Sequence, residues 1–463
     1  MKSTRIIIPA VLSVLLTGCS IFGKYSGTAD VPEGLYGREV PVSAQDSSIA
    51  GIPWKEFFRD PKLRDLIDTA LVRNADIAVA RLRVQEAEAA LLGSKLGFLP
   101  SLTVSPSLSY ENKLSYQIPL SLNWDNQGLG SIVNKKREAQ ARAAQSLDEK
   151  RGTQSRLIAS VSDAYFQLIL LDRQYQIIDA TETVWKNVLQ TQKALMENGK
   201  CYSTSVSQME SSLINVKIRK ADIQNEIKNV EYSICLLLDW TPQEIERGEW
   251  TEYTLPEGLR TGVPAGMLER RADVCSAQRS VEAAYYVSRQ ALAAMFPSLS
   301  LSGMLGWTTQ GVTVKDPAQM IMGAVGSLTQ PIFARGQLRA NYKISKFQQE
   351  EAARVYSQTV LAAGNEVNKN LRECQLAEEK DALYKSQVAI LDESYAATRE
   401  LMRNGKASYI EVLVAQDNLL NAQLSEASNI YSGIISLISL YVSLKAMYPC
   451  REMPASLFAC YGS

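Results

Sequence analysis

The sequence predicts a mainly α-helical protein built from two copies of one unit: a helix, a β-hairpin, a very long helix and a return helix. Three observations lead to this prediction. Short motifs recur in the same order about 200 positions apart, two segments of more than 110 residues contain no proline, and each copy holds a stretch of alternating apolar and polar residues. Repeats of this length indicate a duplicated domain.

Composition excludes several classes of protein. Lys plus Arg and Asp plus Glu both total 49 in 463 residues, so no basic excess favours nucleic acid as a partner. Histidine is absent, which excludes Ser-His-Asp and Cys-His catalysis and His-ligated zinc or haem. A mean hydropathy of −0.11 is too polar for a bundle of membrane-spanning helices. We expect no enzyme activity, no metal and no cofactor.

The first residues predict the destination of the chain. Lys2 and Arg5 precede an apolar run over 6–16, as in a secretory signal peptide. Leu16-Thr17-Gly18-Cys19 resembles the bacterial lipobox, in which the cysteine becomes the lipid-modified first residue. We therefore expect residues 1–18 to be removed, Cys19 to carry the lipid, and Ser20 to direct the protein to the outer membrane. A signal peptide with a chance cysteine is the alternative.

The duplication fixes the predicted domain boundaries. Three pairs of segments match: 74–77 with 271–274, 98–102 with 296–299, and 195–200 with 401–406. The first two pairs are 197 positions apart and the third is 206 apart, so the second copy should contain a longer loop. The predicted parts are a lipidated leader over 19–55, repeat 1 over 56–240, a linker over 241–266, repeat 2 over 267–448, and a tail over 449–463.

Within each repeat, alanine, leucine, glutamate, glutamine, lysine and arginine favour long helices. We expect long helices over about 132–197 and 336–403, with return helices over 203–239 and 409–445. Residues such as Val161, Ala164, Tyr165 and Leu168 recur at coiled-coil spacing, which predicts side-by-side packing.

The predicted hairpins cover about 101–124 and 298–329. In the first, leucine, valine, tyrosine and tryptophan alternate with serine, threonine, glutamine and asparagine. Strands of this length with one apolar face are typical of transmembrane barrels, although a soluble, half-buried hairpin also alternates. Four strands cannot close a barrel, and open edges are costly in lipid. Several protomers should therefore share one barrel, with eight strands from two or twelve from three.

These features together resemble the TolC-like outer-membrane efflux factors, in particular the lipidated branch that serves resistance-nodulation-division pumps. Leu268-Glu269-Arg270-Arg271-Ala272-Asp273-Val274 resembles the Arg-Arg-Pro-Asp-Ile signature of that family, with Ala272 in place of proline. Gln330-Pro331-Ile332-Phe333 with Gly336 resembles its strand-to-helix junction. The resemblance implies a homotrimer in which a twelve-stranded outer-membrane β-barrel continues into a twelve-helix periplasmic α-barrel.

The resemblance also implies functional residues. The tips that contact a periplasmic adaptor protein would be Asn198-Gly199-Lys200 and Asn404-Gly405-Lys406. Glu411 occupies a position where the family carries a pore-facing acidic ring, but the second acidic position is Val414. Ser205 and Gln208 are the counterparts in the first copy. The local alternative is that Glu411 only complements the N-terminus of its helix.

The predicted function is an exit duct that passively exports drugs or other small molecules from an inner-membrane pump, with adaptor, pump and outer-membrane lipid as partners. The sequence contains no Walker-type phosphate loop, so the energy source lies elsewhere. A type I secretion duct and a lipidated periplasmic coiled-coil scaffold that does not span the membrane are the alternatives. Cys450 and Cys460 flank Pro454, and we expect a disulfide between them.

Overall fold

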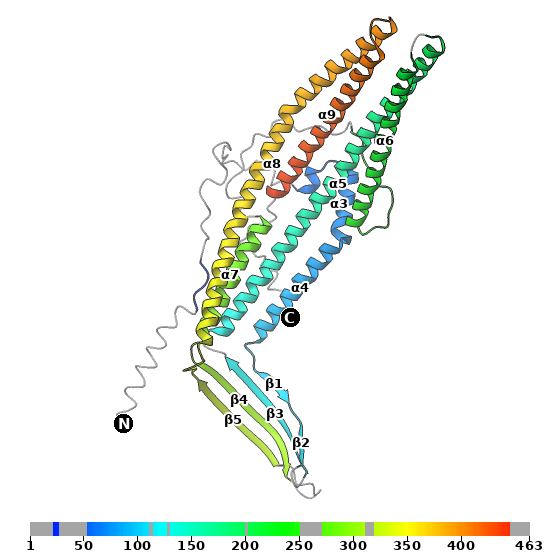
Figure 1. The fold of residues 1–463 in the computed structure, drawn as a ribbon. Coiled ribbons are helices and arrows are strands. Elements are labelled where there is room, and N and C mark those ends of the chain that lie inside the picture. The colour runs from blue at the N-terminus through cyan, green and yellow to red at the C-terminus, as the bar shows by residue number, and fades with distance from the viewer. Residues whose placement is uncertain are drawn as a thin grey trace.

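The computed structural model describes residues 22–26, 53–110, 114–126, 130–199, 202–250, 271–310 and 319–444. The described chain is elongated, with the strands at one end and helix hairpins at the other (Figure 1). It is mainly helical, as predicted from the sequence. The signal peptide, Cys19, Lys200, Cys450 and Cys460 lie outside the described residues.

Each repeat contains one short helix, one hairpin, one long helix and one return helix. In repeat 1 these are α4 (Ala75–Leu96), β1 (Ser101–Val104), β2 (Ser107–Tyr110), β3 (Leu114–Asn126), α5 (Ser131–Glu197) and α6 (Ser203–Leu237). In repeat 2 they are α7 (Ala272–Ala293), β4 (Ser298–Gln310), β5 (Gln319–Thr329), α8 (Gln337–Arg403) and α9 (Tyr409–Leu444). Two further helices, α2 (Trp54–Phe57) and α3 (Pro61–Arg73), precede α4.

The bounds of the helices locate the extra residues of the second copy. Helix α7 begins 197 positions after α4, whereas α8 and α9 begin 206 positions after α5 and α6. The difference therefore arises between the first strand of each hairpin and the start of each long helix, in the hairpin and in the link that follows it.

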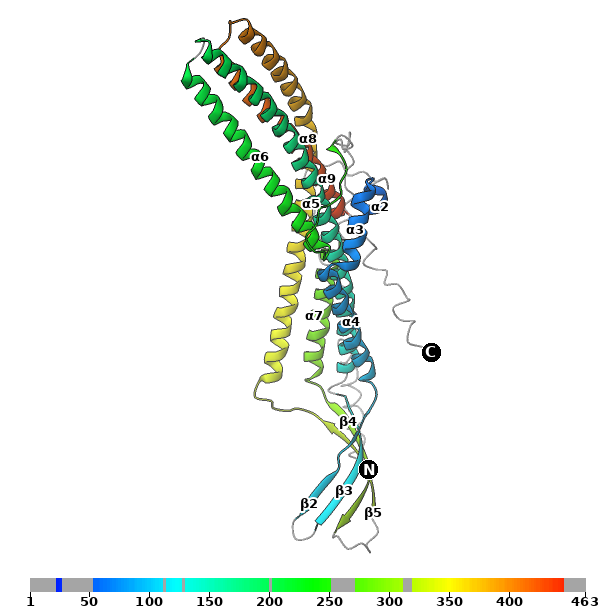
Figure 2. The same ribbon diagram turned by 90° about the vertical axis from the view of Figure 1, so that its right-hand side faces the viewer.

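The long helices α5 and α8 extend along almost the whole helical part of the molecule. Beside them, each short helix is stacked end to end with a return helix, and the two together cover most of that length. Near the sheet, α5 packs between α4 and α7, and α8 packs on α7. In the other half, α5 packs between α6 and α9, and α8 packs on α9 (Figure 2). Helix α4 thus continues the line of α6, and α7 continues the line of α9.

Each end-on junction is joined by one side chain. Asn74 donates from Nδ2 to the carbonyl of Leu237 in the last turn of α6 at 2.9 Å. Arg271 donates from Nη1 to the carbonyl of Ser443 in the last turn of α9 at 3.2 Å. Asn74 and Arg271 occupy equivalent positions in the two repeats. Both bonds satisfy carbonyl groups that a helix C-terminus leaves without an intrahelical partner.

The largest apolar core lies at these junctions. It joins Leu63 and Ile67 of α3 with Tyr165 and Leu168 of α5, and Ile234 of α6. These side chains are almost fully buried, and each contributes roughly 1.5–3 kcal/mol relative to an exposed position. The core holds the midpoint of the molecule together.

Among the described helices, α9 is the one that is apolar and long enough to cross a membrane by composition, with a mean hydropathy of 1.4 over its best window. Over half of that window, 56%, is buried inside the protein. Its Leu440 and Leu444 pack against α7 and α8, and Ile434 and Ile438 join the junction core. Burial against other helices therefore accounts for the apolar composition of α9.

The strands form one antiparallel sheet in the order β1–β3–β4–β5, with β2 also paired to β3. Strands β1 and β2 keep the same register with β3, since Val104 pairs with Leu120 and Leu108 with Tyr116. They are one strand interrupted at Pro106, which has no N–H to donate. A Cβ at Gly306 would lie 2.8 Å from the carbonyl oxygen of Ile118, so glycine permits this close strand pairing.

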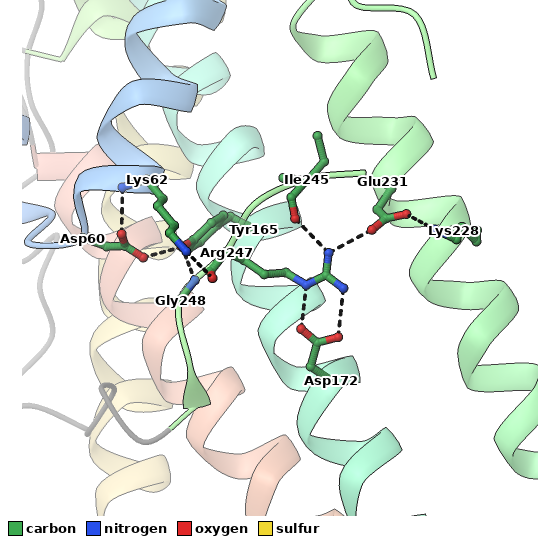
Figure 3. A network of polar contacts seen from close by, with 9 residues as sticks. All are labelled: Asp60, Lys62, Tyr165, Asp172, Lys228, Glu231, Ile245, Arg247 and Gly248. Carbon is green, nitrogen blue, oxygen red and sulfur yellow. Dashed lines mark hydrogen bonds and ion pairs between the residues drawn. The ribbon is translucent and has the colours of Figure 1, made fainter. Parts of the chain in front are cut away.

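A buried network of charges fixes the segment that follows α6 (Figure 3). Arg247 donates to both carboxylate oxygens of Asp172 in α5, at 2.6 and 3.0 Å, and to Glu231 in α6 at 2.8 Å. Tyr165 donates to Asp60 and accepts from the backbone N–H of Gly248. The segment between the repeats is thereby tied to α3, α5 and α6.

The charges of this network remain ionised because they are paired. Burial alone would raise the pKa of the Glu231 carboxyl, but hydrogen bonds from Lys228 and Arg247 lower it below its usual value. Burial would likewise lower the pKa of Arg247, but its bonds to Asp172 and Glu231 raise it. Buried pairs of this kind are strongly destabilised when one partner is removed.

We predict that Arg247→Met destabilises the protein by about 3–5 kcal/mol, because Asp172 and Glu231 would lose the cation they share and the buried Glu231 carboxylate would keep only Lys228. The matched control is Arg372→Met, which removes an exposed pair with Glu379, and its cost should be at most about 1 kcal/mol. Urea unfolding of the purified protein, followed by circular dichroism, measures both. Equal losses in the two variants would contradict a stabilising role for the network.

The same network predicts a pH dependence. The folded-state pKa of Glu231 is lowered, so its contribution to stability is present above its unfolded-state pKa and is lost as the pH falls through the folded-state value. The stability difference between the wild type and Glu231→Gln should therefore shrink as the pH falls below about 4. A difference that stays constant from pH 7 to pH 3 would contradict this assignment.

Candidate functional site

The sheet has one apolar and one polar face. Residues that pair directly across antiparallel strands lie on the same face. Leu120 pairs with Leu305, which pairs with Met322, and Ile118 pairs with Trp307. The opposite face pairs Asn123 with Ser302 and Ser300 with Ser327. Met304 and Val325 are apolar exceptions on the polar face.

The apolar face is exposed to its surroundings. Leu301, Trp307 and Met322 are 46%, 50% and 70% exposed, values that are high for large apolar side chains. Contiguous exposed apolar surface of this kind marks contact with another protein or with a membrane. Trp124, at one end of the face, donates its indole N–H to the carbonyl of Phe98 at 3.1 Å. Aromatic residues toward both ends of an apolar band are typical of membrane strands.

Both edges of the sheet lack a partner strand among the described residues. Strands β1 and β2 pair only with β3, and β5 pairs only with β4. An open edge presents a row of unpaired N–H and C=O groups. The protomer is therefore suited to pair with further strands on both sides.

A short N-terminal segment, Phe22–Ser26, lies on the helices just beside the sheet. Arg137, in the second turn of α5, donates to the carbonyls of Phe22 and Gly23 at 2.9 and 3.3 Å. The backbone N–H of Tyr25 donates to the hydroxyl of Tyr286 in α7. Arg137 lies only ~9 Å from the start of α5, at the helical rise per residue. These contacts fix the position of residue 22 along the long axis of the molecule, close to the sheet. Residue 22 is three positions after Cys19.

The two helix tips have the same geometry. Gly199 and Gly405 adopt left-handed backbone with φ of 70° and 71°. In the second tip, Gly405 N–H donates to Met402 O and Lys406 N–H to Leu401 O, the pattern of a Schellman cap. In both tips an asparagine, Asn198 or Asn404, donates from Nδ2 to a carbonyl one turn earlier. The predicted tip residues that are described are all exposed.

Below the first tip, a charged cluster joins α5 to α6. Lys220 of α6 donates to Glu182 of α5 at 2.7 Å and also pairs with Asp179. Hydrogen bonds from Lys186 and Lys220 lower the pKa of Glu182 to about 2. The two helices of this hairpin are therefore held together by ionised groups at any physiological pH.

The predicted gate residues lie in the first two turns of α6 and α9. Glu411 is exposed and forms a capping box: its carboxylate accepts from the N–H of Ser408, and its own N–H donates to the Ser408 hydroxyl. In the described chain Glu411 therefore stabilises the N-terminus of its own helix, which is the alternative that the sequence offered to a pore-facing ring. The pattern Ser408-x-x-Glu411 is the sequence signature of such a cap.

Of the other gate residues, Gln208 connects the two hairpins. Tyr409 of α9 donates a hydrogen bond to Gln208 of α6, across 201 positions of sequence. Val414 is 54% exposed and borders a hollow of about 340 Å³ between α6 and α9. The indole N–H of Trp185, which also lines the hollow, has no partner among the described residues. Ser205 is buried at the start of α6 and does not contact this hollow.

The described residues offer no group of three or more cysteine, aspartate and glutamate side chains that could hold a metal. Cys235 and Cys374 are free and buried, whereas Cys275 is disulfide-bonded. The partner of Cys275 lies outside the described residues, and so do Cys450 and Cys460. The Cys450–Cys460 disulfide stays a prediction.

Comparison with known proteins agrees with this architecture along both repeats. Residues 66–238 and 263–444 match the protein family described as outer membrane efflux protein. The antibiotic efflux pump outer membrane protein ArpC of Pseudomonas putida is 26% identical over 467 residues, covering 94% of each chain. The probable outer membrane lipoprotein SilC of Salmonella typhimurium is 26% identical over 452 residues, covering 93% of this chain and 96% of SilC.

The fold is also that of a solved channel. The open state of the MtrE outer membrane channel of Neisseria gonorrhoeae superposes with a TM-score of 0.80 at 19% identity. The match covers 93% of this chain and all of MtrE.

Proposed function

This chain belongs to the outer membrane efflux protein family, and from that membership we propose that it is the exit channel of a tripartite efflux system. It would carry drugs or other small molecules from an inner-membrane pump of the resistance-nodulation-division type across the periplasm and outer membrane. The observation that supports this most directly is a sheet with one exposed apolar face and two open edges, joined to helices of 67 residues each. At the helical rise per residue such helices are ~100 Å long.

We propose that three protomers share one barrel. Counting β1 and β2 as one interrupted strand, each protomer supplies four strands of membrane length, and three protomers supply twelve. The edge of β5 would pair with β1 and β2 of the next protomer, which removes the unpaired backbone groups from lipid. The polar face with Asn123, Ser300 and Ser302 would line the passage. Four helix lines per protomer would likewise give a twelve-helix tube.

The docked N-terminal segment supports lipidation of Cys19. Residue 22 lies beside the membrane end of the helices, and three residues span at most ~10 Å. The lipid on Cys19 can therefore reach the inner leaflet of the outer membrane without displacing the segment. Several acyl chains together would anchor the protomer firmly.

We propose that the tips form the periplasmic entrance and meet an adaptor protein of the membrane fusion type. Asn198-Gly199-Lys200 and Asn404-Gly405-Lys406 would be equivalent contact points. Tyr409, Gln208, Val414 and Glu411 would border the entrance, with Ser205 behind them. The chain performs no reaction of its own in this role, and the pump selects the substrate.

The test of this function is extraction of the outer-membrane fraction in detergent, native mass spectrometry, and conductance in planar bilayers. A trimer that carries lipid on Cys19 and conducts is the expected result. A monomer that never conducts would favour the periplasmic scaffold.

We predict that Leu301→Arg reduces the amount of outer-membrane trimer, because Leu301 is the fourth residue of β4 and an arginine facing lipid costs about 2–4 kcal/mol at the membrane centre and less toward its surface. The matched control is Ser302→Arg, one position along on the polar face, which should leave the trimer level near that of wild type. Quantitative immunoblots of unheated membrane samples measure both. Normal trimer with Leu301→Arg would contradict the assigned orientation of the sheet.

Glutamate and glutamine both complete a capping box, so two substitutions separate the roles of Glu411. Glu411→Gln should keep the cap, whereas Glu411→Ala should lose about 1 kcal/mol of stability. If the carboxylates line the entrance, both variants should weaken block of the channel current by divalent cations. Unchanged block in both variants would leave Glu411 with its capping role alone.

A further inference from the structure

The helix ends beside the sheet carry an excess of positive charge. We name this region the basic layer: residues 87–100, 131–140, 284–297 and 330–346, where α4, α5, α7 and α8 meet the strands (Figure 1). It contains nine lysine and arginine residues and two glutamates, although the whole chain has equal numbers of both charges. The rest of the molecule is correspondingly acidic.

Six cations of this layer have no carboxylate partner among the described residues, whereas several cations further along the same helices do. Further along, Arg151 pairs with Asp148, Arg279 with Glu282 and Arg354 with Glu350. Within the layer, by contrast, Lys135, Lys136, Arg137, Arg335, Arg339 and Lys343 form no ion pair with any described residue. Glu138, one of the two glutamates, forms an ion pair of 2.8 Å with Arg142, which lies outside the layer.

The cations also repel one another. Arg289 of α7 and Lys346 of α8 face each other closely enough that burial and the arginine charge together lower the pKa of Lys346. The Nε of Arg289 is buried and has no hydrogen-bond partner among the described residues. Neither α5 nor α8 has an acidic residue in its first turn, where the helix dipole favours anions and disfavours cations. An anion from outside the protein would stabilise this arrangement of cations.

The basic layer adjoins apolar side chains that point away from the protein. Ile332 and Phe333, in the link between β5 and α8, are 96% and 85% exposed. Arg339 and Lys343 are four positions apart in α8 and therefore share one side of that helix, and Arg335 lies in the turn just before it. Lys343 lies over the ring of Phe347, 5.6 Å from its centre. Cations next to exposed apolar residues are typical of surfaces that lie at the headgroup level of a bilayer.

We propose that the basic layer binds the phosphate groups of anionic glycerophospholipids in the inner leaflet of the outer membrane. The surface is continuous with the apolar face of the sheet, and its charge complements the headgroup. The proposal rests on the proposed insertion of the sheet into that membrane. Lipid phosphates at the helix N-termini would relieve the repulsion between the cations and hold the barrel at a defined height.

The test is native mass spectrometry of the full-length protein titrated with phosphatidylglycerol or, separately, phosphatidylethanolamine. We expect the wild type to prefer phosphatidylglycerol, and higher salt to weaken the preference. The variant Arg335→Gln/Arg339→Gln/Lys343→Gln should lose about fivefold or more of that preference, since each cation near an anionic surface contributes about this factor. The matched control, Arg354→Gln/Lys380→Gln/Arg399→Gln, changes the charge of α8 equally outside the layer and should keep the preference.

Equal binding of the two lipids by the wild type, or equal loss in both triple variants, would overturn the proposal. Should the layer variant fail to assemble, Arg339→Gln alone and the salt dependence of the wild type decide the same question. Conductance in phosphatidylcholine bilayers separates this proposal from the channel function. A wild type that conducts but has no lipid preference refutes only the basic layer, whereas one that never inserts refutes the channel.

Discussion

The end-on contact between short and return helices at mid-length is the constraint on which the rest of the structure depends. A helix of 67 residues needs neighbours along its whole length, and neither α4 with 22 residues nor α6 with 35 is long enough alone. The pair supplies the length only if the two helices meet end to end. At that point the C-terminal carbonyls of one helix face the N-terminus of the next, so their dipoles align favourably. Asn74 and Arg271 bridge the two junctions by different chemistry at equivalent positions.

Sequence predicted what is local and repeated. The tips at Gly199 and Gly405 and the alternation of the strands depend on single residues and their near neighbours, and the structure places helix ends and strands within a few residues of the predicted bounds. The contact of Tyr409 with Gln208 was not predictable, because it depends on how two hairpins pack across 201 positions. Arg247 was missed for a different reason. A charged residue in a segment rich in proline and glycine looks solvated, and only the fold shows that Asp172 and Glu231 enclose it.

Interactions are distributed unevenly along the molecule. At mid-length, a large apolar core and two buried arginine clusters, around Arg247 and Arg271, tie several elements together. Toward the tips the apolar clusters are smaller, and the one that joins Trp185 of α5, Met209 of α6 and Leu420 of α9 lies beside the hollow and the bond from Tyr409. Smaller apolar clusters mean lower local resistance to opening. Relative movement of the hairpins should therefore concentrate at the tips, while the midpoint stays fixed.

The membrane end follows a different physical rule, because its neighbours are lipids rather than protein. Three features indicate where the protein lies along the bilayer normal: the apolar strands, the docked N-terminal segment and the proposed basic layer. The positions that they indicate agree. Arg137 belongs to the basic layer and also holds Phe22 and Gly23. The residue that holds the docked N-terminal segment is thus at the level proposed for the lipid headgroups. Because an acyl chain enters the bilayer from that same level, the proposed lipidation at Cys19 and the proposed headgroup binding require the same position of the protein in the membrane.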